Sequence, residues 1–310
     1  MKKWFLYFII VICLTVKVHG WWDVPHMLVA QIAKDNIEPK TCERVEELLS
    51  YFKDHFPKSN SIVTAACFPD DITSLGLSGF KVWHGMLTPY CPDHYLSEET
   101  FSCIEALVND NNILSGINQS LKTLRNPSAS KWEKCFLLRF LLHCVADIHQ
   151  PLHCIQMYSK EFPSGDFAGH RFTISEMPYA DLHQLWDAAF GIGFKRMKRP
   201  LSDQDALWIK ETADFIATNF QNEISPQIHN MNISEWSQES YQLAIDFAYT
   251  GIQPGDKPSQ DYLDKGERIA LRQIALAGFR LGTLLEELFG EVACGVSQQE
   301  SGVNDELNIN

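Results

Sequence analysis

The sequence lacks the surplus of basic residues that a protein needs to bind a polyanion through its own surface. Its 310 residues include 26 Lys and Arg against 39 Asp and Glu, and the formal net charge is −13. Proteins that bind duplex nucleic acid carry more basic than acidic residues, because Lys and Arg make most phosphate contacts. Either the ligand is not a polyanion, or bound metal supplies positive charge locally.

Strand signals are also scarce, and the sequence has no internal repeat and no stretch that resembles an interdomain linker. Residues 171–174 are the best short strand candidate. Elsewhere, hydrophobic residues recur at helical spacing. Helices are expected over residues 24–36, 41–56, 130–150, 180–190, 202–220, 234–249 and 260–288. We therefore expect an all-α fold, with a single mostly helical domain, long loops and little strand.

The apolar run at the N-terminus is too short to span a bilayer comfortably. Lys2 and Lys3 precede an apolar stretch over residues 4–16, and Gly20 is a small residue at a suitable cleavage point. We expect residues 1–20 to be a signal peptide, with a membrane anchor as the alternative. Residues 21–294 should form one domain, and residues 295–310 should be a polar, disordered tail. Cleavage removes three lysines, which leaves 23 basic and 39 acidic side chains and a formal charge of −16. The protein is then secreted or resides in the lumen of the secretory or lysosomal pathway.

Export would place the remaining cysteines in an oxidising compartment. Eight cysteines follow residue 20, and an even number in an exported chain favours disulfide bonds, whose connectivity stays open. They are Cys42, Cys67, Cys91, Cys103, Cys135, Cys144, Cys154 and Cys294. Asn118 and Asn232 begin acceptor triplets for N-glycosylation, so we expect a glycoprotein.

Two histidine–aspartate pairs have the spacing of metal ligands on a helix. His143 and Asp147 are four residues apart, as are His183 and Asp187, and His153 lies just beyond the first pair. Residues at i and i+4 share one helix face, so their side chains can converge on one ion. A single pair would favour an ordinary buried hydrogen bond. Two pairs and a further histidine within 45 residues favour a metal site instead.

Six ordered motifs resemble those of the class I zinc nucleases, which are single-strand-specific nucleases and 3′-nucleotidases related to bacterial zinc-dependent phospholipases C. The motifs are Trp21 with His26, Phe68-Pro69-Asp70-Asp71, Trp83-His84, the pair His143 and Asp147, Gln150-Pro151-Leu152-His153, and Leu182-His183 with Asp187. The resemblance covers residues 21–187, whereas the last third matches only as generic helix.

The resemblance implies a cluster of three Zn²⁺ ions held by nine residues. Asp70, His84 and His143 would bind the first ion, and His153, His183 and Asp187 the second. Trp21, through its free α-amino group and carbonyl, would bind the third with His26, and Asp147 would bridge the first and third ions. Imidazole nitrogen and carboxylate oxygen suit zinc. The third site would require a mature chain that begins at Trp21.

The same resemblance implies a secreted phosphoesterase that hydrolyses single-stranded DNA and RNA and 3′-nucleotides. Its partner would be single-stranded nucleic acid or a nucleotide, and we expect a monomer with no stable protein partner and no membrane anchor. A hydroxide bridging two zinc ions would attack phosphorus, and Asp70 would act as the catalytic residue that orients it.

Four positions depart from the family pattern where the substrate would lie. Thr73 replaces a basic residue that steadies phosphate, and His170 stands in the loop that usually carries an asparagine; we expect both to contact substrate. Gly85 and Leu87 replace residues that hold the base. These departures leave two alternatives open: a phospholipase C-like phosphodiesterase, and a secreted zinc-binding protein without catalytic activity.

Overall fold

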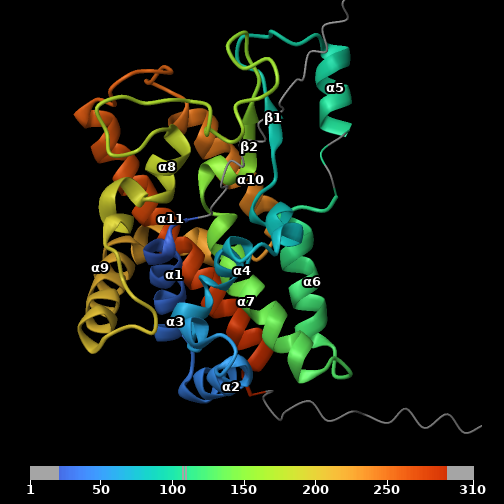
Figure 1. Cartoon of the computed structure of the whole chain (residues 1–310), viewed down its shortest axis with the longest axis vertical. Coiled ribbons are helices and arrows are strands. Elements are labelled where there is room, and N and C mark those ends of the chain that lie inside the picture. The colour runs from blue at the N-terminus through green and yellow to red at the C-terminus, as the bar shows by residue number, and fades with distance from the viewer. Residues whose placement is uncertain (1–20, 107, 109, 292–310) are drawn as a thin grey trace, which may run out of the picture.

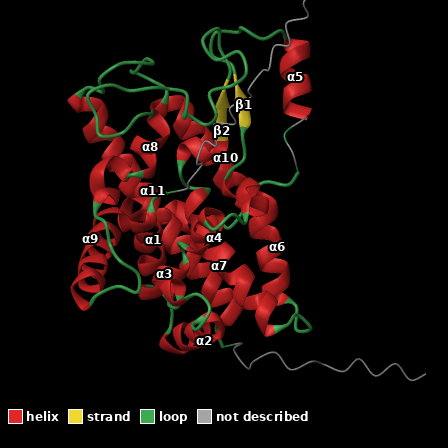
Figure 2. Cartoon of the chain, viewed as in Figure 1, coloured by secondary structure: helices red, strands yellow, loops and turns green. Residues whose placement is uncertain are grey.

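Helices dominate the computed structural model, which describes residues 21–106, 108 and 110–291 (Figure 2). The predicted signal peptide, the tail 295–310 and Cys294 lie outside the described residues. The α-helices are α1 (Asp23–Asp35), α2 (Pro39–Leu49), α3 (Ile62–Ala65), α4 (Phe68–Ser74), α5 (Glu98–Ala106), α6 (Ile113–Arg125), α7 (Lys131–Asp147), α8 (Leu182–Asp187), α9 (Asp203–Ile228), α10 (Ile233–Leu243) and α11 (Gln260–Phe289). The expectation of a mostly helical fold with little strand is confirmed.

Helix α7 runs through the middle of the helical bundle, between α1, α4, α6 and α11 (Figure 1). A capping box starts it: the Ser130 hydroxyl accepts a hydrogen bond from the Glu133 amide, and the Glu133 carboxylate accepts one from the Ser130 amide. Every residue from Leu137 to Asp147 is buried. The polar side chains on its last turns therefore lie inside the molecule.

Helix α1 is held by close packing against the long helix α11. Gly278 of α11 has no side chain where it meets α1; a Cβ there would lie 2.5 Å from a methyl carbon of Ile32. Any larger residue would push the two helices apart. This contact helps to fix the direction of α1, whose first turn follows Trp21 and carries His26.

Two short 3-10 helices and a pair of strands position His84 and His153 near the end of α7. The 3-10 helix η4 (Pro151–Cys154) leads directly into β2 (Ile155–Met157), which pairs in parallel with β1 (Thr88–Tyr90). A second 3-10 helix, η3 (Ser78–His84), precedes β1. The prediction of a strand over residues 171–174 is wrong, because Thr173 forms only an isolated bridge to Asp181.

The cysteines do not pair within the described residues, contrary to the expectation of disulfide bonds. All seven that the structure places are free. Four are buried at separate points, and each thiol contacts a different backbone carbonyl: that of Asp23, Leu49, Trp83 or Ile148. The thiols of Cys67, Cys135, Cys144 and Cys154 are therefore satisfied as small core groups. Among the helices that the structure describes, none is long and apolar enough to cross a membrane.

Candidate metal centre

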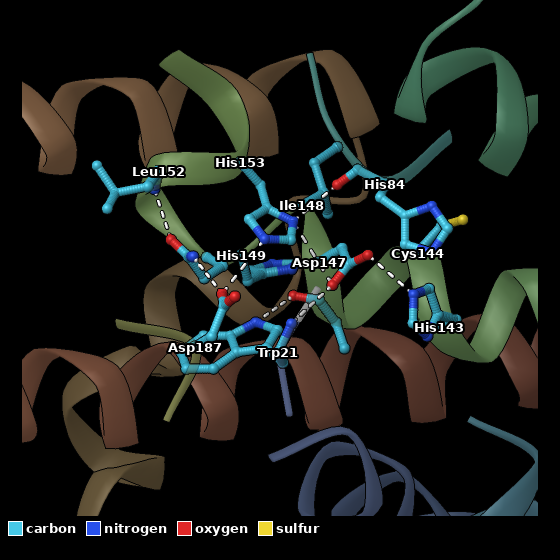
Figure 3. A network of polar contacts seen from close by, with 12 residues as sticks. Trp21, His84, His143, Cys144, Asp147, Ile148, His149, Leu152, His153 and Asp187 are labelled. Carbon is cyan, nitrogen blue, oxygen red and sulfur yellow. Dashed lines mark hydrogen bonds and ion pairs between the residues drawn. The ribbon is translucent and has the colours of Figure 1, made fainter. Parts of the chain in front are cut away.

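Asp147 lies at the centre of the predicted ligands, on the last turn of α7 (Figure 3). Its Oδ2 is 3.0 Å from Nε2 of His143, one helical turn earlier. Its Oδ1 is 3.4 Å from Nε2 of His26 and 3.3 Å from the backbone nitrogen of Trp21. These side chains are fully buried. One carboxylate thus links α7 to the start of α1.

The second histidine–aspartate pair lies on the short helix α8. Nε2 of His183 is 3.1 Å from Asp187 Oδ2, and Nε2 of His153, from η4, is 3.4 Å from Asp187 Oδ1. Asp181 caps α8 by accepting a hydrogen bond from the Gln184 amide, which fixes its first turn. Helix α8 and η4 therefore meet through one carboxylate.

Asp70 and His84 complete the cluster from α4 and η3. His84 Nε2 is 3.3 Å from Asp70 Oδ1, and the His84 ring meets the His143 ring edge-on, with 4.7 Å between centroids. Pro69 occupies the first turn of α4, where the absence of an amide hydrogen costs nothing. Asp70 is 8% exposed, which makes it the most accessible of the buried ligand candidates.

Backbone carbonyls fix the orientation of four of the five histidines. Nδ1 contacts a carbonyl oxygen in each, so that Nε2 faces the cluster. The contacts are His84 to Lys81 at 3.2 Å, His143 to Ala66 at 2.7 Å, His153 to His84 at 2.7 Å and His183 to Ala168 at 2.6 Å. Metal-binding histidines are held in this way, because the Nδ1–H hydrogen bond sets both tautomer and ring position.

Several buried polar atoms that face the cluster make no hydrogen bond. They are both ring nitrogens of His26, Nε2 of His84, His143 and His153, Oδ1 of Asp70 and Oδ2 of Asp147. Buried polar atoms without hydrogen bonds are rare in folded proteins, because losing water costs free energy. Their gathering at one point fits a bound cation, which would satisfy all of them together.

Three groups of these residues have ligand atoms within 4.8 Å of one another. The groups are His26 with Asp70 and His143, His84 with His143 and Asp147, and His153 with His183 and Asp187. The last group is the set expected for the second ion. The other two draw on the residues expected for the first and third ions, in a different combination. All nine predicted ligands therefore lie together, including Trp21 through its backbone nitrogen.

The carboxylates shift the protonation of the histidines that they contact. Burial opposes charge on His143, but Asp147 and Asp70 outweigh it and raise the pKa to about 9. Asp187 has the same effect on His183, whose pKa rises to about 9. Burial, reinforced by the charge on His143, lowers the pKa of His26 to about 3.

The aspartates stay ionised in spite of their burial. Desolvation alone would raise the pKa of Asp147, but His143 and His153 outweigh it and hold the pKa below its usual range. The pKa of Asp70 is also lowered, because His143 and His84 outweigh its burial. The site therefore presents anionic oxygens at neutral pH, which is the state that binds a cation.

Of the two predicted substrate contacts, His170 lies against a ligand candidate, and Thr73 lies on the helix that carries Asp70. The His170 ring stacks on the His183 ring, with 3.8 Å between centroids, and its Nδ1 is 3.6 Å from Asp181. The Thr73 hydroxyl on α4 is buried and makes no hydrogen bond. Neither residue lines the two cavities described next. Their contacts with substrate stay predictions.

Two cavities reach the candidate ligands. One, of about 520 Å³, contains His84, His153 and His183, together with the aliphatic side chains of Val82 and Leu87. The other, of about 740 Å³, contains Asp70 and is bordered by residues 193–199. The basic run within that border, at residues 195–199, stands out in the acidic sequence but belongs to none of the six motifs. The carbonyls that orient the histidines have no sequence signal at all.

Comparison with known proteins places this arrangement in a family. The S1/P1 nuclease family pattern matches residues 21–290. The chain belongs to the S1/P1 nuclease family. Endonuclease 2 of Arabidopsis thaliana is 24% identical over 293 residues, covering 88% of this chain and 92% of that protein. Endonuclease 4 of the same plant is 24% identical over 311 residues, covering 93% and 96%. Membership of the family supports hydrolysis of phosphodiester bonds by this chain.

Proposed function

We propose that this S1/P1 family member is an exported nuclease that holds three zinc ions and hydrolyses phosphodiesters of single-stranded DNA and RNA, and 3′-nucleotides. The observation that carries the proposal is the buried convergence of five histidines and three aspartates on the start of α1. Its support is the set of unsatisfied atoms that face one another there. Membership of a nuclease family supports the class of substrate.

The proposed roles follow from the position of each residue. Asp147 lies between Trp21, His26 and His143, so it would bridge two ions. Bound zinc supplies positive charge for the phosphate and lowers the pKa of a water molecule. Asp70 faces a cavity and stays ionised, so its carboxylate can accept a hydrogen bond from an attacking water and orient it.

The phosphate would reach the centre in spite of the acidic surface, because the ions bring local positive charge. The chain carries 39 acidic against 26 basic residues, so attraction through bulk charge is absent. Three divalent ions would add six positive charges against three ligand carboxylates, which leaves the pocket positive.

A phospholipid headgroup is the second candidate substrate, and one observation favours it. The cavity beside His84, His153 and His183 is lined by Val82 and Leu87, which are 43% and 42% exposed, and by Ile104. These aliphatic side chains suit an alkyl chain, although Tyr158 also lines the cavity and offers an aromatic ring on which a nucleobase can stack. We place this candidate second because the matched family and the matched relatives are named as nucleases.

Zinc-loaded protein assayed on a single-stranded oligonucleotide, 3′-AMP and phosphatidylcholine separates these candidates. We expect cleavage of the oligonucleotide and release of phosphate from 3′-AMP, both abolished by chelation and restored by zinc. Hydrolysis of phosphatidylcholine alone would replace the proposal by the second candidate. Full zinc content without hydrolysis of any of these substrates would contradict both.

A further inference from the structure

The cavity that contains Asp70 has a basic border in an otherwise acidic protein. Residues 195–199 carry four cations in five positions, and we call them the basic segment. They follow η5 (Ala189–Phe194) and line the cavity of about 740 Å³ together with Trp22, Asp23 and Asp71. No role for this segment follows from the metal centre, because none of its residues is a ligand candidate.

Two of the four cations are engaged within the protein. Arg199 donates to both oxygens of Asp71, at 2.8 and 2.9 Å, and to Asp23 at 3.0 Å. This link ties the segment to α4, the helix that carries Asp70. Lys195 lies over the Trp208 ring and 3.8 Å from Asp205.

The other two cations are exposed. Arg196 and Lys198 border the cavity, and neither forms an ion pair with any residue that the structure describes. Of the carboxylates that line the cavity, Asp23 and Asp71 are already paired with Arg199, and Asp70 is a candidate metal ligand. The border of the cavity therefore presents two exposed positive charges without an ion-pair partner among the described residues.

An aromatic platform adjoins the same border. Phe194 is 40% exposed and stacks on Tyr179, with ring centroids 4.8 Å apart and planes at 22°. Trp22 meets Phe194 edge-on at 5.4 Å. Cations next to an exposed aromatic face are the combination that binds single-stranded nucleic acid, because the backbone pairs with charge while bases stack.

We propose that the basic segment, with Phe194, is a subsite for the sugar–phosphate backbone of a single-stranded nucleic acid that extends away from Asp70. The proposal rests on the proposed nuclease function. Arg196 and Lys198 would contact phosphates beyond the one that is hydrolysed, and Phe194 would stack on a base. The subsite would favour chains several nucleotides long over mononucleotides.

An anionic membrane is the other partner that exposed cations and aromatics can meet, but the shape of the site argues against it. The cations border a recess that contains a candidate metal ligand. A flexible strand can enter a recess, whereas a bilayer rests on a projecting apolar face. We therefore assign the segment to a nucleic acid.

The test removes the two exposed charges and compares the result with a matched loss elsewhere. The variant Arg196→Gln/Lys198→Gln and the control Lys53→Gln/Lys58→Gln change the net charge equally, and all four side chains are exposed. For a 20-nucleotide single strand at 0.1 M salt, we expect KM and the Kd from fluorescence anisotropy to rise about 10- to 30-fold in the first variant. The association constant decreases as salt increases, and a plot of its logarithm against log salt should become shallower by about 1.4 in the first variant, because two phosphate contacts are lost. The increase in KM should be larger for the 20-mer than for a dinucleotide.

Each outcome bears on one proposal at a time. If the wild-type protein cleaves the 20-mer and both variants share its KM and salt slope, the subsite is refuted and the nuclease function stands. If the wild-type protein binds the 20-mer through Arg196 and Lys198 but hydrolyses no nucleotide, the subsite stands and the proposed function fails. Loss of binding to phosphatidylserine vesicles in the first variant, with an unchanged Kd for the 20-mer, would assign the segment to membranes and overturn the proposal.

Discussion

At the scale of single residues, the site depends most on Asp147, which contacts His143 on its own helix and His26 and the Trp21 backbone nitrogen at the start of α1. Asn in its place keeps the shape but removes the negative charge. We expect Asp147→Asn to lose metal from the positions that share this carboxylate, and to lose hydrolytic activity with it. Zinc analysis and an oligonucleotide assay on the same preparation measure both. Full zinc content with activity near that of the wild type would show that Asp147 is not a ligand.

Gln150 acts on the metal centre through Asp187, without being a ligand candidate. Its Nε2 donates to Asp187 Oδ1 at 2.7 Å, which holds the carboxylate toward His153 and His183. Removing such a hydrogen bond lowers metal affinity about 10- to 100-fold. We expect the zinc held by Asp187 to bind less tightly by this factor in Gln150→Ala, in a competition titration with a chelator. An unchanged zinc affinity would mean that the hydrogen bond does not position Asp187.

Protonation of the histidines makes metal binding depend on pH. In the metal-free protein His143 and His183 have pKa values near 9, so both are protonated at pH 7.5, whereas His26, with a pKa of about 3, is already neutral. Zinc requires the unprotonated nitrogen, so at pH 7.5 binding releases about two protons from these histidines and most of one from the α-amino group of Trp21, and affinity increases up to about pH 9. Calorimetry in two buffers of different ionisation enthalpy measures the release. Binding without proton release would contradict these pKa values.

Much of the site could be predicted from residue spacing, because both histidine–aspartate pairs lie on helices. His143 with Asp147, and His183 with Asp187, face each other as the four-residue spacing requires. The convergence of His26 and Asp70 on the same point depends on how α1 and α4 pack against α7. Spacing along the chain carries no information about that packing. For those residues the resemblance to a family was the only guide.

At the scale of elements, the helices α1, α7, α8 and α11 could be predicted, whereas α5 and α6 could not. Helix α11 begins at the expected residue, and the capping box at Ser130 starts α7 as expected. Helix α5 was not predicted; it has nine residues, none of them buried, and only Phe101 and Ile104 are large apolar residues. Helix α6 was also missed, although Asn112 forms a capping box with Ser115 at its start. The parallel pairing of two three-residue strands is a long-range contact without a local pattern.

The cap of α7 allows stability to be separated from metal binding. Ser130 is far along the helix from Asp147, and its hydroxyl satisfies an amide at the first turn. We expect Ser130→Ala to lower the free energy of unfolding by about 1 kcal/mol, because an N-cap hydrogen bond is lost. Zinc content and KM should stay those of the wild type. Denaturant unfolding of the two zinc-loaded proteins measures the difference, and loss of zinc in the variant would show that the α7 start and the metal centre are coupled.

At the scale of the whole molecule, the fold surrounds a small charged centre with an apolar core. Most of the ligand candidates are 3% exposed or less, and α1, α7 and α11 pack their apolar faces around them. Buried charges of this kind are costly without a counter-ion. The proposed nuclease function would rely on bound ions, and on the few cations that border the Asp70 cavity, to attract an acidic substrate to an acidic protein.

The most direct test of this account is the zinc content of purified protein that begins at Trp21, measured by elemental analysis after removal of loosely bound metal. Nine residues converge on one centre, and the account predicts three zinc ions per chain. Two or fewer, in protein that is folded and starts at Trp21, would contradict the trinuclear site.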